Sequence, residues 1–175
     1  MSVCLMSTID VSTQSDDLDE FARQWQSEGI EGDLLPMKII GRMFRLMKTI
    51  EVEVGRCHEA FDLKYGEFDV LATLRRTGAP HCLTPSQLHQ SMLLSSGAMT
   101  NRLDKLEQKG LIARAHSQED RRSVKVQLTD KGKQVIEAVF PLHMQTLRSL
   151  LNNMDTSSRE LLAGALKQWL AGIQD

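Results

Sequence analysis

The sequence predicts a mainly α-helical protein that carries one small β-hairpin. Apolar residues recur at helical spacing over most of the 175 residues, and residues 112–116 and 124–128 have the pattern of two short strands. Hydrophobic residues make up 41% of the chain and charged residues 25%, which is typical of a soluble globular protein with an ordinary core. The formal net charge of -2 excludes a polycation, so any binding of nucleic acid requires basic residues to gather on one side.

The first 30 residues are expected to form a disordered tail and one added helix. Residues 1–15 are rich in Ser, Thr and Asp, a composition that favours disorder. Residues 16–30 contain an apolar stripe at helical spacing: Leu18, Phe21, Ala22 and Trp25. A single tryptophan on such a helix more often packs the helix onto the protein than binds a ligand.

Residues 31–62 and 130–175 are expected to form dimerisation helices. The segment from Asp33 to about Phe61 is the longest helix candidate, and it has more apolar surface than a single core needs. Residues 130–175 contain two further amphipathic helices, and Pro141 should kink the first because it lacks the N–H that continues the helical ladder. Wide apolar faces of this kind predict burial against a second copy of the chain.

A helix and a short strand are expected between the long helix and the central motif. The helix runs from Gly66 to Arg76, and residues 78–80, Gly-Ala-Pro, end it. The following residues 81–83, His-Cys-Leu, could add a third strand beside the hairpin.

Residues 84–110 predict two short helices joined by a tight bend. The start Thr84-Pro85-Ser86-Gln87 combines a capping threonine, a first-turn proline and a capping-box glutamine. Ser95 or Ser96 should cap the second helix, which ends at Gly110. The outer face of that helix carries side chains of the right length to read base edges: Ser96, Thr100, Asn101, Lys105 and Gln108. The pattern is that of a helix-turn-helix, although a two-helix corner of an ordinary core would look the same.

The predicted hairpin follows this motif directly. Its second strand alternates apolar and polar residues from Val124 to Leu128, the pattern of a half-buried strand. The loop carries Arg121 and Arg122, and two arginines on an exposed tip suit a narrow, electronegative minor groove. Asp120 is placed to orient one of them. A hairpin in this position favours nucleic-acid binding over an ordinary solvated loop.

The order and spacing of these features resemble the MarR family of bacterial winged-helix regulators. The residues that carry the resemblance are Thr84, Asn101-Arg102-Leu103, Leu106-Glu107, Gly110-Leu111-Ile112, Asp120-Arg121-Arg122-Ser123 and Leu128-Thr129-Asp130-Lys131-Gly132. The match covers roughly residues 30–175. The resemblance implies a winged helix-turn-helix with N- and C-terminal dimerisation helices, in which residues 63–129 form the DNA-binding lobe. It also implies a homodimer that binds palindromic operators, usually as a repressor, and that small ligands release in many members.

The DNA contacts follow from the polar face and the resemblance together. They are Ser95, Ser96, Thr100, Asn101 and Lys105 in the second helix, and Arg121 and Arg122 in the loop. The family pattern Asp-x-Arg favours Arg122 for the minor groove. Between Ser95 and Lys125 there are seven basic and four acidic residues, a modest positive patch in an otherwise acidic chain.

Four residues resemble the ligand-binding set of the family's urate-responsive branch: Trp25, Asp69, Arg102 and Arg114. The resemblance implies a planar purine anion such as urate or xanthine, with arginines at the oxo edge and the indole stacked on the ring. Only Trp25 distinguishes this branch, so another planar aromatic anion, or no ligand, stays open. The structural alternative is an ion pair between Asp69 and Arg102, with Arg114 bracing the hairpin.

Other functions have weaker support in the sequence. The odd count of three cysteines argues against a disulfide framework. Neither Cys57 nor Cys82 has an obvious basic activator in sequence, as a redox-responsive regulator of the same fold would need. The five histidines lack metal-ligand spacing, and no motif of an enzyme or of a cofactor site is present. A protein-interaction dimer without DNA binding is the remaining alternative. No signal peptide or membrane span is recognisable, so we expect a cytoplasmic protein.

Overall fold

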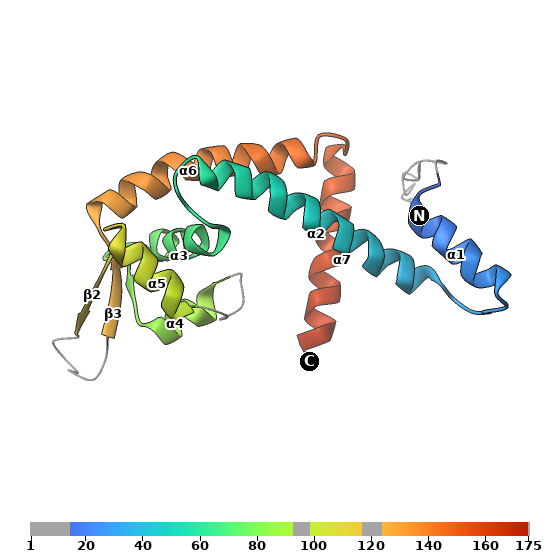
Figure 1. Cartoon of the computed structure of the whole chain (residues 1–175), viewed down its shortest axis with the longest axis horizontal. Helices are drawn as coiled ribbons and strands as arrows, with labels where there is room; N and C mark the ends of the chain where they lie inside the picture. Colours follow the sequence, from blue (N-terminus) through green and yellow to red (C-terminus); the bar gives the residue numbers. More distant parts are fainter. Residues whose placement is uncertain (1–14, 93–98, 117–123, 175) are drawn as a thin grey trace, which may run out of the picture. The chain divides into compact units, whose positions relative to one another are not determined.

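The computed structural model describes residues 15–92, 99–116 and 124–174 and confirms the predicted class, a mostly helical chain with a small antiparallel sheet (Figure 1). The elements in chain order are α1 (Asp17–Ser27), α2 (Leu35–Glu59), α3 (Tyr65–Arg76), β1 (Cys82–Leu83), α4 (Pro85–Ser91), α5 (Met99–Gln108), β2 (Ile112–His116), β3 (Val124–Leu128), α6 (Asp130–Leu150) and α7 (Thr156–Gln174).

The chain divides into two compact units. One comprises residues Ile50–Ser149, and the other comprises residues Met1–Thr49 together with Leu150–Asp175. The first unit contains the motif and the hairpin that the sequence singles out. None of the helices in the described residues is long and apolar enough to cross a membrane.

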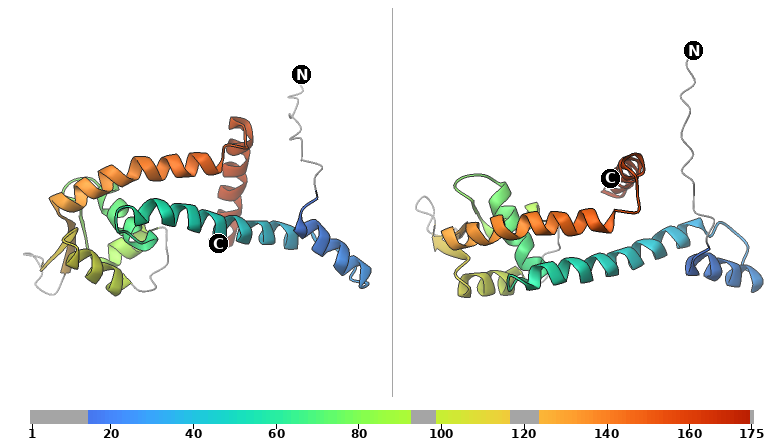
Figure 2. Two further views of the ribbon diagram at one scale, coloured as in Figure 1. Left: turned by 45° about the horizontal axis from the view of Figure 1, so that its top comes forward. Right: turned by 90° about the horizontal axis from the view of Figure 1, so that it is seen from above.

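In the Ile50–Ser149 unit, three strands form an antiparallel sheet in the order β1-β3-β2. Strand β3 is central: Leu83 of β1 and Arg114 of β2 both pair with Val126, which is fully buried. The left view of Figure 2 shows the paired strands β2 and β3 beside α5, with α6 beginning where β3 ends. The strand at Cys82–Leu83 confirms the predicted third strand.

One hydrophobic core holds the helices of this unit against the sheet. Its members include Leu71 and Leu74 of α3, Leu88 of α4, Leu106 of α5 and Ile136 of α6, all less than 2% exposed. Because α4 and α5 each place an inner face in this core, the outer face of α5 is left on the surface.

The ends of the helices have the local structure that the sequence predicts. The Thr84 and Gln87 side chains accept hydrogen bonds from each other's backbone N–H at 3.2 and 2.9 Å, which confirms the capping box of α4. Helix α5 ends at Gln108. Gly110 follows with a φ of 69°, in the left-handed region, and the N–H of Leu111 bonds back to the carbonyl of Leu106.

Helix α6 begins at a tightly packed turn and continues through its proline. Its cap, Thr129, accepts a hydrogen bond from the N–H of Gly132 at 3.0 Å. A Cβ atom at Gly132 would lie 1.9 Å from the carbonyl oxygen of Leu111, so this close approach requires glycine. Pro141 does not end α6, which runs on to Leu150.

In the other unit, helix α1 docks on the first half of α2. Leu18 lies over Gly41. A Cβ atom added to Gly41 would be 2.4 Å from a methyl carbon of Leu18. Ion pairs support this contact: Asp16 and Asp19 with Arg42, Asp17 with Arg45, and Asp19 with Lys38. The hydrogen bonds from Arg42 lower the pKa of Asp16.

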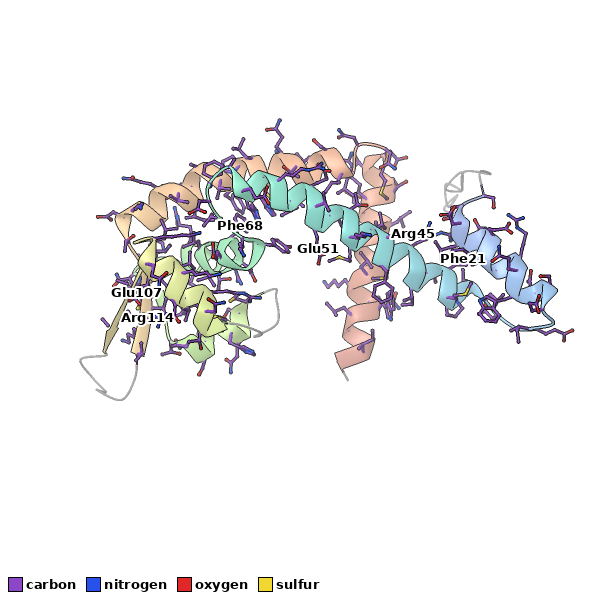
Figure 3. All side chains as sticks on the ribbon, in the orientation of Figure 1. Phe21, Arg45, Glu51, Phe68, Glu107 and Arg114 are labelled. Carbon is purple, nitrogen blue, oxygen red and sulfur yellow. The ribbon has the colours of Figure 1, made fainter. Side chains whose placement is uncertain are left out.

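The aromatic residues of α1 are less buried than the predicted apolar stripe suggests. Phe21 is 42% exposed and lies beside Arg45, whose guanidinium carbon is 5.8 Å from the ring centre (Figure 3). Trp25 is 51% exposed. The structure therefore gives the docking role expected of Trp25 to Leu18, which is 5% exposed.

Candidate nucleic-acid interface

Helix α5 separates an apolar inner face from a polar outer face. Leu103 and Leu106 are buried in the core, while Thr100 and Asn101 are exposed and Lys105 is half-buried. Side chains that donate and accept hydrogen bonds from an exposed helix can read base edges in a major groove. The other predicted contacts, Ser95, Ser96, Arg121 and Arg122, lie outside the described residues, as does the expected cap of α5.

Arg76 connects the end of α3 to the end of α4. Its Nη2 donates to the carbonyl oxygen of Ser91, the last residue of α4, and to the hydroxyl of buried Thr73 at 3.3 Å. A guanidinium at a helix C-terminus satisfies a free carbonyl and opposes the negative end of the helix dipole. The C-terminal end of α4 is therefore fixed to the end of α3.

Arg114 attaches the hairpin to α5. Its Nη2 donates to Oδ1 of Asp104 at 2.5 Å, and its backbone N–H donates to Oε1 of Glu107 at 3.2 Å. Figure 3 shows Glu107 and Arg114 side by side where β2 meets α5. This contact supports the bracing role considered for Arg114, because strand and helix are joined by charged hydrogen bonds.

Arg102 lies across the first turn of α3. A Cβ atom at Gly66 would be only 2.4 Å from Nε of Arg102, so glycine leaves the space that the guanidinium occupies. The predicted recognition helix α5 therefore lies close to the start of α3 at this point. Sequence reasoning predicted Arg102 as a site residue but not the glycine that admits it.

A cleft of about 430 Å³ opens at this contact. Its lining is rich in charge and includes Glu51, Lys64, Tyr65, Glu67, Asn101, Arg102 and Lys105. Glu67 is 2% exposed and is neutralised by Lys109, whose Nζ lies 2.9 Å away. Burial opposes the charge of Lys109, but its bonds to Glu67 and Asp62 outweigh that effect and raise its pKa. The cleft is therefore basic on balance, and it reaches the outer face of α5 through Asn101 and Lys105.

The four predicted ligand residues have different surroundings. Arg102 lines the cleft, whereas Asp69 is 5% exposed on α3 and Arg114 pairs with acids of α5. Trp25 belongs to the other compact unit. Lys64 and Tyr65 were not predicted, although a Lys-Tyr-Gly sequence at the start of a helix could have drawn attention to them.

A buried histidine pair lies behind this region and joins α2, α3 and α6. Nε2 of His58 is 3.2 Å from Nδ1 of His143. Both rings pack on Phe68, whose ring centre is 4.1 Å from that of His58 and 4.4 Å from that of His143. Burial, with a smaller effect of His143, lowers the pKa of His58 to about 4, and burial also lowers the pKa of His143. Both rings are therefore neutral near pH 7, with one donating to the other.

The redox and metal-binding alternatives depend on the cysteines and on clusters of possible metal ligands. Cys57 and Cys82 are free and half-buried. Over residues 15–92, 99–116 and 124–174, no group of three His, Cys, Asp or Glu side chains is arranged to hold a metal ion.

Comparison with known proteins gives a consistent result. The family model described as "MarR family" matches residues 63–124. The chain is 35% identical over 150 residues to the HTH-type transcriptional regulator PecS of Dickeya dadantii, covering 86% of this chain and 90% of that protein. It is 29% identical over 132 residues to the HTH-type transcriptional regulator MhqR of Bacillus subtilis, covering 75% of this chain and 89% of that protein.

Solved structures are similar as well. A mutant MarR from E. coli complexed with operator DNA matches with a TM-score of 0.68 and 26% identity, covering 79% of this chain and 99% of that one. Sco3205 from Streptomyces coelicolor in complex with DNA matches with a TM-score of 0.74 and 16% identity, covering 83% of this chain and 92% of that one. The second likeness concerns the fold alone.

Proposed function

Because the chain belongs to the MarR family, we propose that it regulates transcription by binding a palindromic operator as a homodimer. The observation that carries this function is the exposed polar side of α5, with Thr100 and Asn101, held outward by a core that buries Leu103 and Leu106. The solved relative at 26% identity is complexed with operator DNA. Two recognition helices related by a two-fold axis would enter successive major grooves about 34 Å apart.

In this proposal the DNA contacts are divided between the two grooves. Five residues at and near α5 enter the major groove: Ser95, Ser96, Thr100, Asn101 and Lys105. Arg121 and Arg122 enter the adjacent minor groove, where negative potential favours guanidinium groups. The brace between Arg114 and Asp104 supports this arrangement because it fixes the base of the hairpin against α5.

A second copy of the chain provides the cover that the terminal helices need. Large apolar side chains are exposed on α2 and α7, among them Phe44, Leu46, Met47, Leu166, Leu170 and Ile173. A soluble monomer rarely exposes so much apolar surface, and burial in a two-fold interface removes it from water. The predicted dimerisation segments, residues 31–62 and 130–175, contain both helices.

A planar anion such as urate or xanthine would release the operator. The basic cleft around Arg102 supports an anionic ligand, and Tyr65 offers an aromatic surface beside it. A ligand in this cleft would lie against Asn101 and Lys105, so ligand and DNA would compete for the same helix. Release by tenfold to a hundredfold needs only about 1.4–2.8 kcal/mol of differential binding. Trp25 belongs to the proposed urate-like set only through the resemblance of the sequence to that branch.

Binding to DNA from upstream of the protein's own gene tests the function. The wild type should retard such a fragment in a gel, and Asn101→Ala should reduce the preference over unrelated DNA because a base-reading amide is lost. The control is Gln26→Ala, at an exposed position of α1 outside both the motif and the predicted dimerisation segments. A dimer that retards no fragment would support the alternative of an interaction protein without DNA binding.

A further inference from the structure

A second hollow lies in the Ile50–Ser149 unit, between α3 and α6, and it is distinct in lining from the basic cleft. Its volume is about 330 Å³, and its apolar wall is formed by Ala72, Ile136, Phe140 and Pro141. Phe140 is 48% exposed, so its aromatic ring lies at the surface of the groove and not in the core. This volume is at the lower end of the range of small-molecule sites, roughly 300–1,000 Å³.

The charged rim of the groove contains more cations than anions. Arg75 and Arg76 lie on the α3 side, and Glu137 lies on the α6 side. Nε and Nη2 of Arg75 are 3.0 and 2.9 Å from Oε1 of Glu137, so one carboxylate already shows the geometry that this guanidinium accepts. Two guanidinium groups and one carboxylate line the rim, which leaves a net positive charge that complements a single additional carboxylate.

The dimensions of the groove limit the apolar part of a ligand. Its α6 wall runs from Ile136 to Pro141, which are five residue steps apart, and at the helical rise this is about 7.5 Å. This length accommodates an extended chain of about six to eight carbons, and burial of each methylene group favours binding.

We propose that the groove between α3 and α6 binds an aliphatic monocarboxylate of medium chain length. The alkyl chain lies along Ala72, Phe140 and Pro141, and the carboxylate is bound by Arg75 and Arg76 at the rim. Glu137 is the internal competitor that the ligand displaces from Arg75.

The groove is connected to the DNA-binding motif through Arg76. The same guanidinium that lines the rim also holds the carbonyl of Ser91 at the end of α4. A carboxylate that draws Arg76 toward the groove frees the carbonyl at the end of α4, a helix that packs in the same core as α5. Ligand binding therefore weakens operator binding, an effect that rests on the proposed function, whereas binding to the groove itself does not.

Calorimetric titration of the full-length protein with octanoate tests the site directly. Octanoate should bind, and butanoate, which has the same head group but a short chain, should bind at least about tenfold more weakly because four methylene groups are missing. Glu137→Gln removes the competing carboxylate and should tighten octanoate binding. Arg75→Gln should weaken it, and Ala72→Phe, which fills the groove, should abolish it.

The matched control is Glu53→Gln, which breaks the exposed Arg56–Glu53 ion pair on α2 and should leave octanoate binding unchanged. If Ala72→Phe and Arg75→Gln both bind octanoate as the wild type does, the fatty acid is binding to the exposed apolar helices and the proposal is wrong. The absence of any binding at millimolar octanoate, as expected if a second copy covers the groove, also overturns it.

The link to DNA needs a separate measurement. Octanoate should weaken operator binding by about fivefold, and Arg76→Ala should weaken it without ligand and remove the further response. If octanoate binds in the groove but operator affinity does not change, the coupling through Arg76 is refuted while the site remains. If the protein binds no operator, the calorimetric result still decides the site independently of the proposed function.

Discussion

Lowering the pH from 8 to 5 should destabilise the Ile50–Ser149 unit through the buried pair of His58 and His143. The pKa of His58 is lowered from 6.5 to about 4 in the folded chain, chiefly by burial. Between these values the unfolded chain takes up a proton that the folded chain does not, so stability falls as the pH falls. Well above pH 6.5 the histidine does not change the free energy of unfolding. The loss of stability reaches its full size below about pH 4.

The size of the effect follows from proton linkage. With pKa values of 6.5 unfolded and about 4 folded, His58 alone should cost about 2 kcal/mol at pH 5 relative to pH 8. The lowered pKa of His143 acts in the same direction, but the two rings share one hydrogen bond and their contributions do not simply add. For a chain of this length, 2 kcal/mol corresponds to a decrease in melting temperature of about 4–8 °C.

Thermal unfolding followed by circular dichroism at pH 8, 7, 6 and 5 measures this effect. The double variant His58→Gln, His143→Gln keeps hydrogen-bonding groups in both positions but cannot take up the proton, so its melting temperature should fall less between pH 8 and 5. His89→Gln, at an exposed position, is the control and should behave as the wild type does. A double variant with the full wild-type dependence on pH would refute the assignment to the histidine pair.

Three further predictions concern the DNA and ligand sites. Arg122→Ala should weaken operator binding and reduce the slope of log affinity against log salt by about one. Fluorescence anisotropy at salt concentrations from roughly 50 to 200 mM measures this slope. An unchanged slope would show that Arg122 does not contact phosphate. Urate should raise the melting temperature and free operator DNA, and Trp25→Phe should blunt both responses; no response at millimolar urate would eliminate this ligand. Gly66→Ala should displace Arg102, which lies 2.4 Å from the added Cβ position, and should lower anion binding in a titration more than the exposed substitution Gly164→Ala does.

Local patterns in the sequence were sufficient to predict the elements around the motif. The strands Ile112–His116 and Val124–Leu128 have the predicted bounds because alternation of apolar and polar residues determines which residues can face the core. The capping box at Thr84 and the stop at Gly110 depend on side chains within a few residues, and both are confirmed.

Contacts between distant residues could not be predicted in the same way. His58 and His143 are 85 residues apart, and neither has a local pattern that indicates the other. Histidine spacing along a single helix is a local pattern, so it cannot indicate a pair whose members lie on α2 and α6. Arg114 was expected in two alternative roles, and only the tertiary contact with Asp104 favours the bracing role.

The partial exposure of Trp25 has a related cause. Helical spacing predicts that Leu18, Phe21, Ala22 and Trp25 share one side of α1, but it does not predict how wide the contact with α2 is. Gly41 provides a close fit for Leu18, whereas Phe21 and Trp25 remain 42% and 51% exposed.

Directed cleavage of operator DNA tests most directly whether the outer side of α5 lies in a major groove. Thr100→Cys, made in a background with serine in place of Cys4, Cys57 and Cys82, would carry a tethered iron–EDTA group at an exposed position of α5. Our account predicts two clusters of strand cleavage, symmetric about the operator centre and about one helical turn, roughly 34 Å, apart. Uncut DNA despite retained operator binding, or one unsymmetric cluster, would contradict it.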